Sequence, residues 1–359
     1  MDRRTFLRAA GAAGLAGTSA TAGCLGFQLS EGGVPPVVED RPDAVYYPSH
    51  VEGMEMAGMG TGGDYQVAVM YSFPHRFWNV NAESVERTDI RGEDAVHLMT
   101  AIWDPDTGQI LPDTGLSVEI LQDGELVSQE VIYPMLSQPM GFHYGANFPL
   151  PSDGTYTVRA DVGAVTTRKT GAFREKFAEA ATVDVAFEYS QSAVDDIQFE
   201  TLDDAGETGA VEPMSMEMLP PSTAPATDEL PGRVVGEATS NDAVLVATVL
   251  DSPPEGVEGD GSYLAVSART PYNRMLIPAM GLDAALTRGD ESVYEGELTA
   301  TLDPDLSYHY GAVVDGVEDG DELELTPTVW PQTARHEGYE TAFGALQGGM
   351  PPVTITVGN

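Results

Sequence analysis

A short sequence that occurs twice at a fixed spacing is the strongest constraint on how this chain folds. HYGANF, at residues 143–148, returns as HYGAVV at residues 309–314, an offset of 166. The same offset aligns Pro112 with Pro278, Leu98 with Leu264, and Phe177 with Phe343. An offset kept over so long a stretch predicts a duplicated module, and therefore two domains of similar fold.

Both modules have the residue pattern of β-strands. Apolar and polar residues alternate at 65–71, 116–121, 156–162 and 181–187 in the first module, and strand-like runs occupy 243–250 and 353–357 in the second. Turn sequences such as Gln122-Asp123-Gly124 separate the strands, and no apolar period of 3.6 residues is evident. The pattern predicts an all-β chain of two tandem antiparallel β-sandwiches.

Composition and the repeat place the boundaries. We expect an export signal at 1–24, a Gly- and Pro-rich tether at 25–44, a first sandwich at 45–200, an acidic Pro-rich linker at 201–232 and a second, diverged sandwich at 233–359. The linker composition favours an extended segment, because it offers little apolar surface to offset the entropy of ordering.

The charge balance excludes one class of partner. The 359 residues carry 57 acidic and 17 basic side chains, a formal net charge of -40. Such a surface repels nucleic acid, and its self-repulsion is best tolerated in high salt, so a halophilic source is expected. Because 42% of the residues are hydrophobic, the chain has enough apolar material for real cores and does not have the composition of a disordered protein.

The N-terminus predicts export by the twin-arginine route. Arg3-Arg4 precede a weakly apolar run at 9–22 that is too short to span a membrane, and the run ends at Cys24, the only cysteine. Small residues before this cysteine resemble a lipobox, which would lipidate Cys24 and anchor the protein to the outer face of the cytoplasmic membrane. The alternative is an incidental cysteine in a cleaved peptide. With one thiol, an internal disulfide or cysteine metal site is excluded.

Histidine and methionine in the first module point to a metal site. His97 and Met99 lie two residues apart in a predicted strand and so share a face, while Met135, Met140 and His143 follow in the next segments. Imidazole and thioether form a soft nitrogen and sulfur ligand set suited to copper, and added oxygen ligands would widen the choice to iron or manganese. The alternative is structural, because methionine fills irregular cores and a strand histidine is often simply hydrogen-bonded.

Secondary candidates lie outside that segment. Met54 and Met56 are possible copper(I) ligands, although alternating methionines in a strand also form one apolar row on a core face. His309 and His336 are the candidates in the second module. The stretch 74–78, which includes His75, is interpreted as closing the sandwich or forming an interface.

The motifs resemble a known family. Asp94-Ala95-Val96-His97-Leu98, Tyr133-Pro134-Met135 and His143-Tyr144-Gly145-Ala146-Asn147 are similar to motifs of the periplasmic proteins that work beside a high-affinity iron permease. In that family H-L-E, M-P-M, H-Y-G-D-N and R-H-T-D surround one metal site on an immunoglobulin-like sandwich that dimerises, with copper bound and iron as the presumed cargo. The resemblance covers about residues 90–180 and implies immunoglobulin-like domains and a possible homodimer.

Carried over residue by residue, the resemblance is incomplete. His97, His143 and Met135 match family ligands, whereas Met99 stands where the family has glutamate, which would favour copper(I). The family's R-H-T-D becomes Arg168-Lys169-Thr170 and supplies no imidazole. In the second module the losses are complementary, since its equivalents of His97 and Met135 are Tyr263 and Thr301, but His309 and an Arg335-His336 pair are present.

Together these features predict a function. We expect a lipid-anchored, extracytoplasmic metal-binding protein that captures copper or iron ions and passes them to a membrane iron or metal permease. Sequence signatures of an enzyme, such as a phosphate loop or a zinc motif of the H-E-x-x-H type, do not occur. The alternative is a structural or adhesive surface protein of two β-sandwiches without bound metal.

Overall fold

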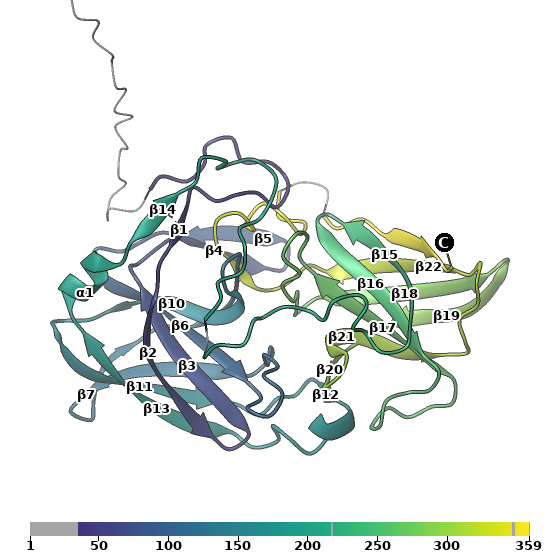
Figure 1. Ribbon diagram of the computed structural model, residues 1–359, viewed down its shortest axis with the longest axis horizontal. Helices are drawn as coiled ribbons and strands as arrows, with labels where there is room; N and C mark the ends of the chain where they lie inside the picture. The colour runs from purple at the N-terminus through teal and green to yellow at the C-terminus, as the bar shows by residue number, and fades with distance from the viewer. Residues whose placement is uncertain (1–34, 217, 347–348, 359) are drawn as a thin grey trace, which may run out of the picture.

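The computed structural model describes residues 35–216, 218–346 and 349–358, and it is almost entirely β structure (Figure 1). This confirms the predicted all-β class. Beside the strands, these residues form only a short α-helix, α1 (Gln191–Asp196), and a 3-10 turn, η1 (Gly171–Phe173). A helix able to cross a membrane is not found among them. The proposed signal, Cys24 and residues 25–34 of the tether lie outside the described residues.

The first half of the chain forms a sandwich of an eight-stranded and a four-stranded sheet. In spatial order the larger sheet contains β2 (Glu55–Gly62), β3 (Tyr65–Ser72), β6 (Asp94–Trp103), β10 (Gly141–Pro149), β9 (Tyr133–Ser137), β23 (Ala334–Arg335), β4 (Phe77–Asn81) and β5 (Ser84–Thr88). The smaller sheet contains β13 (Ala181–Tyr189), β11 (Gly154–Val162), β7 (Leu116–Gln122) and β8 (Glu125–Gln129). A separate two-stranded ribbon joins β1 (His50–Glu52) to β14 (Phe199–Thr201).

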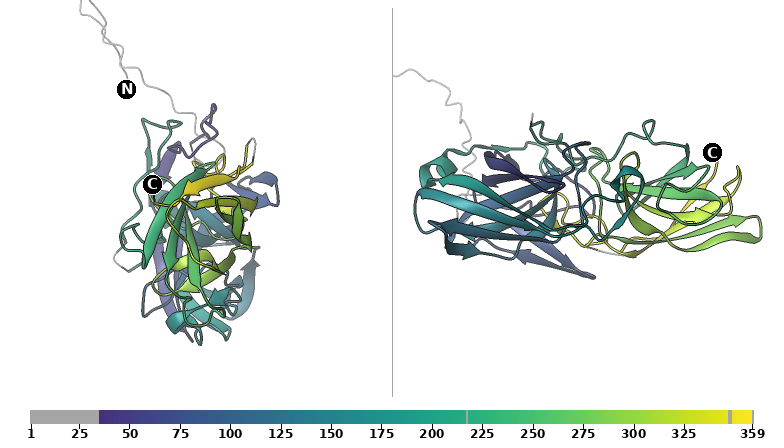
Figure 2. Two further views of the ribbon diagram at one scale, coloured as in Figure 1. Left: turned by 90° about the vertical axis from the view of Figure 1, so that its right-hand side faces the viewer. Right: turned by 90° about the horizontal axis from the view of Figure 1, so that it is seen from below.

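The second half repeats this plan with fewer strands. Its larger sheet contains β12 (Arg168–Lys169), β20 (Thr299–Asp303), β21 (Ser307–Val314), β17 (Ser262–Arg269), β16 (Ala243–Leu250) and β15 (Arg233–Ser240). Facing it are β19 (Glu291–Glu297), β18 (Gly281–Arg288), β22 (Glu322–Val329) and β24 (Val353–Thr356). The two sandwiches lie side by side along the long axis of the molecule (Figure 2).

The two halves exchange equivalent short strands. β23, from the second half, inserts between β9 and β4 of the first, with Ala334 opposite Met135. In return β12, from the first half, runs parallel to β20 of the second, with Arg168 opposite Thr301. The yellow segment that crosses into the first sandwich in Figure 1 carries β23. Both exchanges obey the 166-residue offset, so the halves are related by an approximate twofold relation.

Burial along the strands shows which sheet faces are covered. In β13, buried and exposed residues alternate, as expected for a strand with one face on a core and one in water. In β6 and β10 nearly every residue is buried, so both faces of these strands are covered. One face packs on the sandwich core, and the other lies beneath segments from elsewhere in the chain.

The segments between and before the modules are also packed. Residues 201–232 are mostly irregular, but the Ser222 side chain is 2% exposed and its hydroxyl accepts a hydrogen bond from the Phe142 amide. Before the first strand, the Val38 amide donates to Glu337, and Arg41 pairs with Glu340. The acidic Pro-rich segment therefore runs along the protein surface rather than free in solvent, because its few apolar residues find places in a core shared by both halves.

Candidate metal centre

Three adjacent strands place the predicted ligands on the outer face of the first sandwich. β10 pairs with β6 so that Asn147 lies opposite His97, and with β9 so that His143 lies opposite Met135. Because side chains alternate along a strand, these four residues project from the same face of the sheet. His97, His143 and Met135 are all at most 1% exposed.

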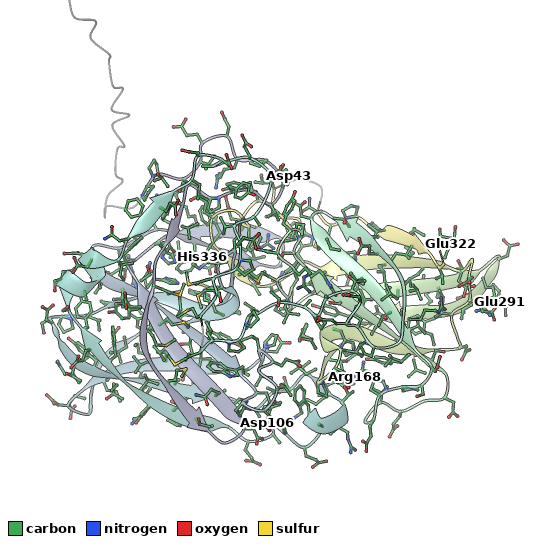
Figure 3. All side chains as sticks on the ribbon, in the orientation of Figure 1. Asp43, Asp106, Arg168, Glu291, Glu322 and His336 are labelled. Carbon is green, nitrogen blue, oxygen red and sulfur yellow. The ribbon has the colours of Figure 1, made fainter. Side chains whose placement is uncertain are left out.

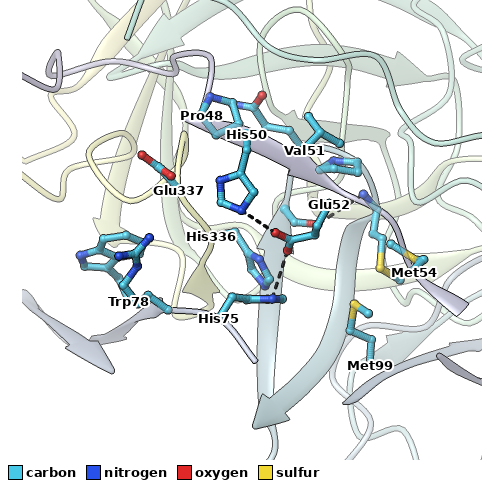
Figure 4. A pocket seen from close by; sticks show the side chains of 15 residues that line it. Pro48, His50, Val51, Glu52, Met54, His75, Trp78, Met99, His336 and Glu337 are labelled. Atoms are coloured by element: carbon cyan, nitrogen blue, oxygen red, sulfur yellow. Dashed lines mark hydrogen bonds and ion pairs between the residues drawn. The ribbon is translucent and has the colours of Figure 1, made fainter. Parts of the chain in front are cut away.

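Further imidazoles reach this face from segments that cover it. His75 lies between β3 and β4, and His336 directly follows β23 (Figure 4). One ligand atom from each of His75, His97 and His336 lies within 4.8 Å of the other two. The His143 ring centroid is 5.4 Å from that of His336. Four histidines thus converge, with His75, His97 and His143 buried and His336 partly buried, and Figure 3 shows His336 among the strands of the first half.

Hydrogen bonds hold His336 against the first half of the molecule, although it lies in the second half of the sequence. Its amide donates to the Leu136 carbonyl at 3.0 Å. The preceding Arg335 is fully buried, and its guanidinium donates to the Ala342 and Pro331 carbonyls. These bonds tie both ends of the 331–342 loop together, so that the inserted strand presents His336 at a fixed position.

The hydrogen bonds of the rings set their tautomers. His143 Nδ1 lies 3.0 Å from the Gly141 carbonyl, which can only accept, so Nδ1 carries the proton. His97 Nδ1 lies 2.8 Å from Asn147 Oδ1, and the Asn147 amide is oriented by its own donation to the His75 carbonyl at 3.0 Å. His75 Nδ1 lies 3.2 Å from the Phe73 carbonyl. Each proton on Nδ1 leaves Nε2 with a free lone pair.

Those lone pairs are unsatisfied. The Nε2 atoms of His75, His97, His143 and His336 are all buried, and none has a hydrogen-bond partner within the described residues. A buried polar atom without a partner costs about 1–3 kcal/mol, so several in one place call for an explanation. Ring nitrogens held by Nδ1 hydrogen bonds with Nε2 facing a common point are the arrangement that metal-binding histidines adopt.

Burial keeps these imidazoles neutral. It lowers the pKa of His143 to about 4, and it lowers the pKa of His97 and His336 well below 6.5, with neighbouring histidines adding to the effect. Burial likewise lowers the pKa of His75, although Glu52 opposes it. Near pH 7 the cluster therefore offers lone pairs without prior loss of a proton, which favours cation binding.

A carboxylate lies beside the cluster. Glu52 Oε1 is 3.1 Å from His75 Nδ1, and Oε2 is 3.1 Å from His50 Nε2 (Figure 4). Burial raises the pKa of Glu52, but His75 and His50 lower it more, to about 2. The carboxylate is ionised near pH 7, orients His75 and places a negative charge next to the histidine cluster.

The methionine candidates occupy three kinds of place. Met135 Sδ and His97 Nε2 both lie against Gly145, so Met135 is at the cluster itself. Met54, Met99 and Met140 line a cavity whose wall also includes His75 and His336. Met56, in β2, lies opposite Met70 of β3 and packs against the hydrophobic core. This agrees with the alternative that the methionines form an apolar row on a core face.

Two expectations about histidines need correction. The sequence groups His336 with His309 as candidates in the second module, but the structure separates them: His336 joins the first cluster, and His309 Nε2 lies 3.0 Å from Tyr263 Oη in the second half. The sequence pattern assigns His75 to a closing segment, yet its ring centroid lies 3.8 Å from that of His97. The signal that could have linked His336 to the first cluster is the complementary loss in the two halves. The first half lacks the family's histidine after Arg168, and the second half has a histidine after Arg335.

Gly145 gives a direct test of the geometry. A Cβ at this position would lie 2.8 Å from His97 Nε2 and 2.9 Å from Met135 Sδ. We expect Gly145→Ala to displace both groups and weaken metal binding, at a stability cost of about 1–3 kcal/mol. Isothermal titration with copper(II) and a denaturant melt measure the two effects. Gly115→Ala is the control, because nothing lies within 4 Å of its Cβ; equal copper affinity in both variants would contradict the assigned geometry.

Comparison with known proteins adds little to this geometry. Residues 228–356 match a family described as a domain of unknown function, DUF7350. No curated protein matches the chain. Similar solved structures include FetP of uropathogenic E. coli strain F11, "as isolated", and a copper-bound variant of it. Each is 19% identical and covers 38% of this chain and 97% of its own, with TM-scores of 0.29 and 0.28. At such scores the fold and the site rest on this chain's own geometry.

Proposed function

We propose that the protein binds one copper ion in the cluster of His75, His97, His143 and His336, with Met135 as an additional ligand. One observation carries this proposal: four neighbouring histidines each have a buried Nε2 atom without a partner among the described residues, and one ring nitrogen from each of His75, His97 and His336 lies within 4.8 Å of the other two. A cation is the ligand that satisfies them all at once. The interpretation of these histidines as ordinary hydrogen-bonded core residues accounts for the Nδ1 atoms of His75, His97 and His143 but leaves all four Nε2 atoms unexplained.

The donor types favour copper over iron. Imidazole nitrogen and thioether sulfur suit copper in both oxidation states, whereas ferric iron prefers carboxylate oxygen. The nearby Glu52 carboxylate is already engaged by two histidines. Iron remains the second candidate because Glu52 could turn toward the ion. We assign no catalytic step to the site.

The cavity beside the cluster supplies a path for the ion. Its wall combines partly exposed Met54 and Glu52 with buried Met99 and Met140, and it also includes His75 and His336. Weak thioether and carboxylate ligands along an approach would allow exchange with the cluster. Together with the twin-arginine sequence and Cys24, this supports a lipid-anchored protein outside the cytoplasm that captures a metal ion for a membrane permease. The family resemblance implies the same role with iron as the presumed cargo, whereas the donor set of this chain favours copper.

Metal titration separates this proposal from a structural or adhesive protein. The purified chain, cleared of metal by dialysis, should bind about one equivalent of copper(II) or copper(I) in molar salt, and iron less tightly. No binding above background would leave only the structural alternative.

We expect Met135→Leu to weaken the binding of copper(I) more than that of copper(II), because the thioether is the softest donor of the set. Met56→Leu is the matched control, and equal losses for both ions would remove Met135 from the ligand set.

A further inference from the structure

The second half contains a position that corresponds to the metal cluster residue by residue. At the offset of 166, His309 stands for His143 and Tyr263 for His97. The strand register agrees, since Thr301 lies opposite His309 as Met135 lies opposite His143. The His309 ring is also oriented in the same way as that of His143, with its Nδ1 at 3.0 Å from the Ser307 carbonyl.

Protein groups satisfy the lone pair of this second histidine. Because the His309 Nδ1 proton goes to Ser307, Nε2 is the acceptor, and the Tyr263 hydroxyl donates to it at 3.0 Å. Tyr263 is fully buried and lies against Gly311, where a Cβ would come within 2.2 Å of its hydroxyl oxygen. The second position therefore lacks the unsatisfied nitrogen that marks the first.

A guanidinium fills the remaining space. Arg168 Nη2 donates to Tyr263 Oη at 2.9 Å and to the Gly311 carbonyl at 2.7 Å, and Nε donates to Thr301 Oγ1 at 2.8 Å. With the Thr299 carbonyl at 3.4 Å from Nη2, four oxygen acceptors thus surround one positive charge. The residue equivalent to Arg168 in the other half is Ala334, whose small side chain leaves room beside Met135.

We propose that the Arg168 guanidinium occupies the second of two equivalent cation positions, so the chain carries one metal site and one arginine-closed copy of it. Both positions join the halves: His336 reaches from the second half into the first cluster, and Arg168 reaches from the first half into the second. The ion at the first position is exchangeable and the guanidinium is permanent. The halves therefore stay connected when the ion leaves.

Rebuilding the second position tests this proposal, which rests on the first cluster binding copper. In the variant Arg168→Ala/Thr170→His/Tyr263→His/Thr301→Met, each change introduces the residue found at the equivalent position of the first cluster. Those residues are, in the same order, Ala334, His336, His97 and Met135. We expect it to bind two equivalents of copper(II) where the unmodified chain binds one, as counted by titration and electron paramagnetic resonance. Adding His143→Ala should reduce the rebuilt chain to one equivalent.

The decisive control keeps Arg168 and makes only the other three changes. It should bind one equivalent, because the guanidinium still fills the ion position. A second ion in this control, or only one ion in a folded rebuilt variant, would overturn the inference. If the four changes prevent folding, Arg168→Ala/Tyr263→His answers the same question through the imidazole pair at 263 and 309. An unmodified chain that binds no copper would instead refute the proposed function.

Discussion

His143→Ala is expected to abolish stoichiometric copper binding, whereas His309→Ala is expected to leave it intact. The two residues are matched controls for each other: each is 1% exposed, sits at the equivalent position of its half, and directs Nδ1 at a backbone carbonyl 3.0 Å away. They differ at Nε2, which is unsatisfied in His143 and bonded to Tyr263 in His309. Titration of both variants, with circular dichroism to verify folding, measures the difference.

His336→Ala extends this test across the two halves. If the cluster is built as described, its loss should weaken copper binding about as strongly as that of His143, although His336 belongs to the other half by sequence. Unchanged stoichiometry in His336→Ala would confine the site to the first half. Equal losses in His143→Ala and His309→Ala would indicate a general effect of removing a buried imidazole.

Acid is expected to destabilise the metal-free protein between about pH 6.5 and pH 4. Burial lowers the pKa of five histidines, His143 and His309 to about 4 and the other three, His75, His97 and His336, in the same direction. Below pH 6.5 these histidines become protonated in the unfolded chain but stay neutral in the folded chain. The free energy of unfolding therefore falls as the pH falls. For His143 alone the loss reaches roughly 3 kcal/mol by pH 4.

Denaturant melts at pH 7.5, 6 and 5 in constant salt measure this loss. Glu340 and Asp242 act in the opposite sense, because burial raises the pKa of each, but they are two groups against five. The contribution of Glu52, whose pKa is lowered to about 2, is lost only below its unfolded value near 4.5. Bound copper should add stability at pH 7 by mass action and lose it on acidification. A free energy of unfolding that is constant from pH 7.5 to 5 would contradict the burial of neutral imidazoles.

Residue patterns are enough to predict the all-β class, the duplication and the part of the site that lies on neighbouring strands. Alternation places His97 and Met99 on one face of a strand, and the pairing of strands near in sequence brings His143 and Met135 to that face. These relations are local, so periodicity and spacing are enough to express them.

The residues that complete the site do not follow from such patterns, because long-range packing brings them to it. His75 enters because the segment after β3 folds over the sheet, and His336 enters because β23 is inserted between β9 and β4. Such contacts join residues up to about 260 positions apart, and their geometry depends on how both halves pack rather than on any local pattern. The same packing brings Arg168 to Tyr263 and Gly311 at the corresponding position of the second half. The sequence Arg168-Lys169-Thr170 does not reveal this role.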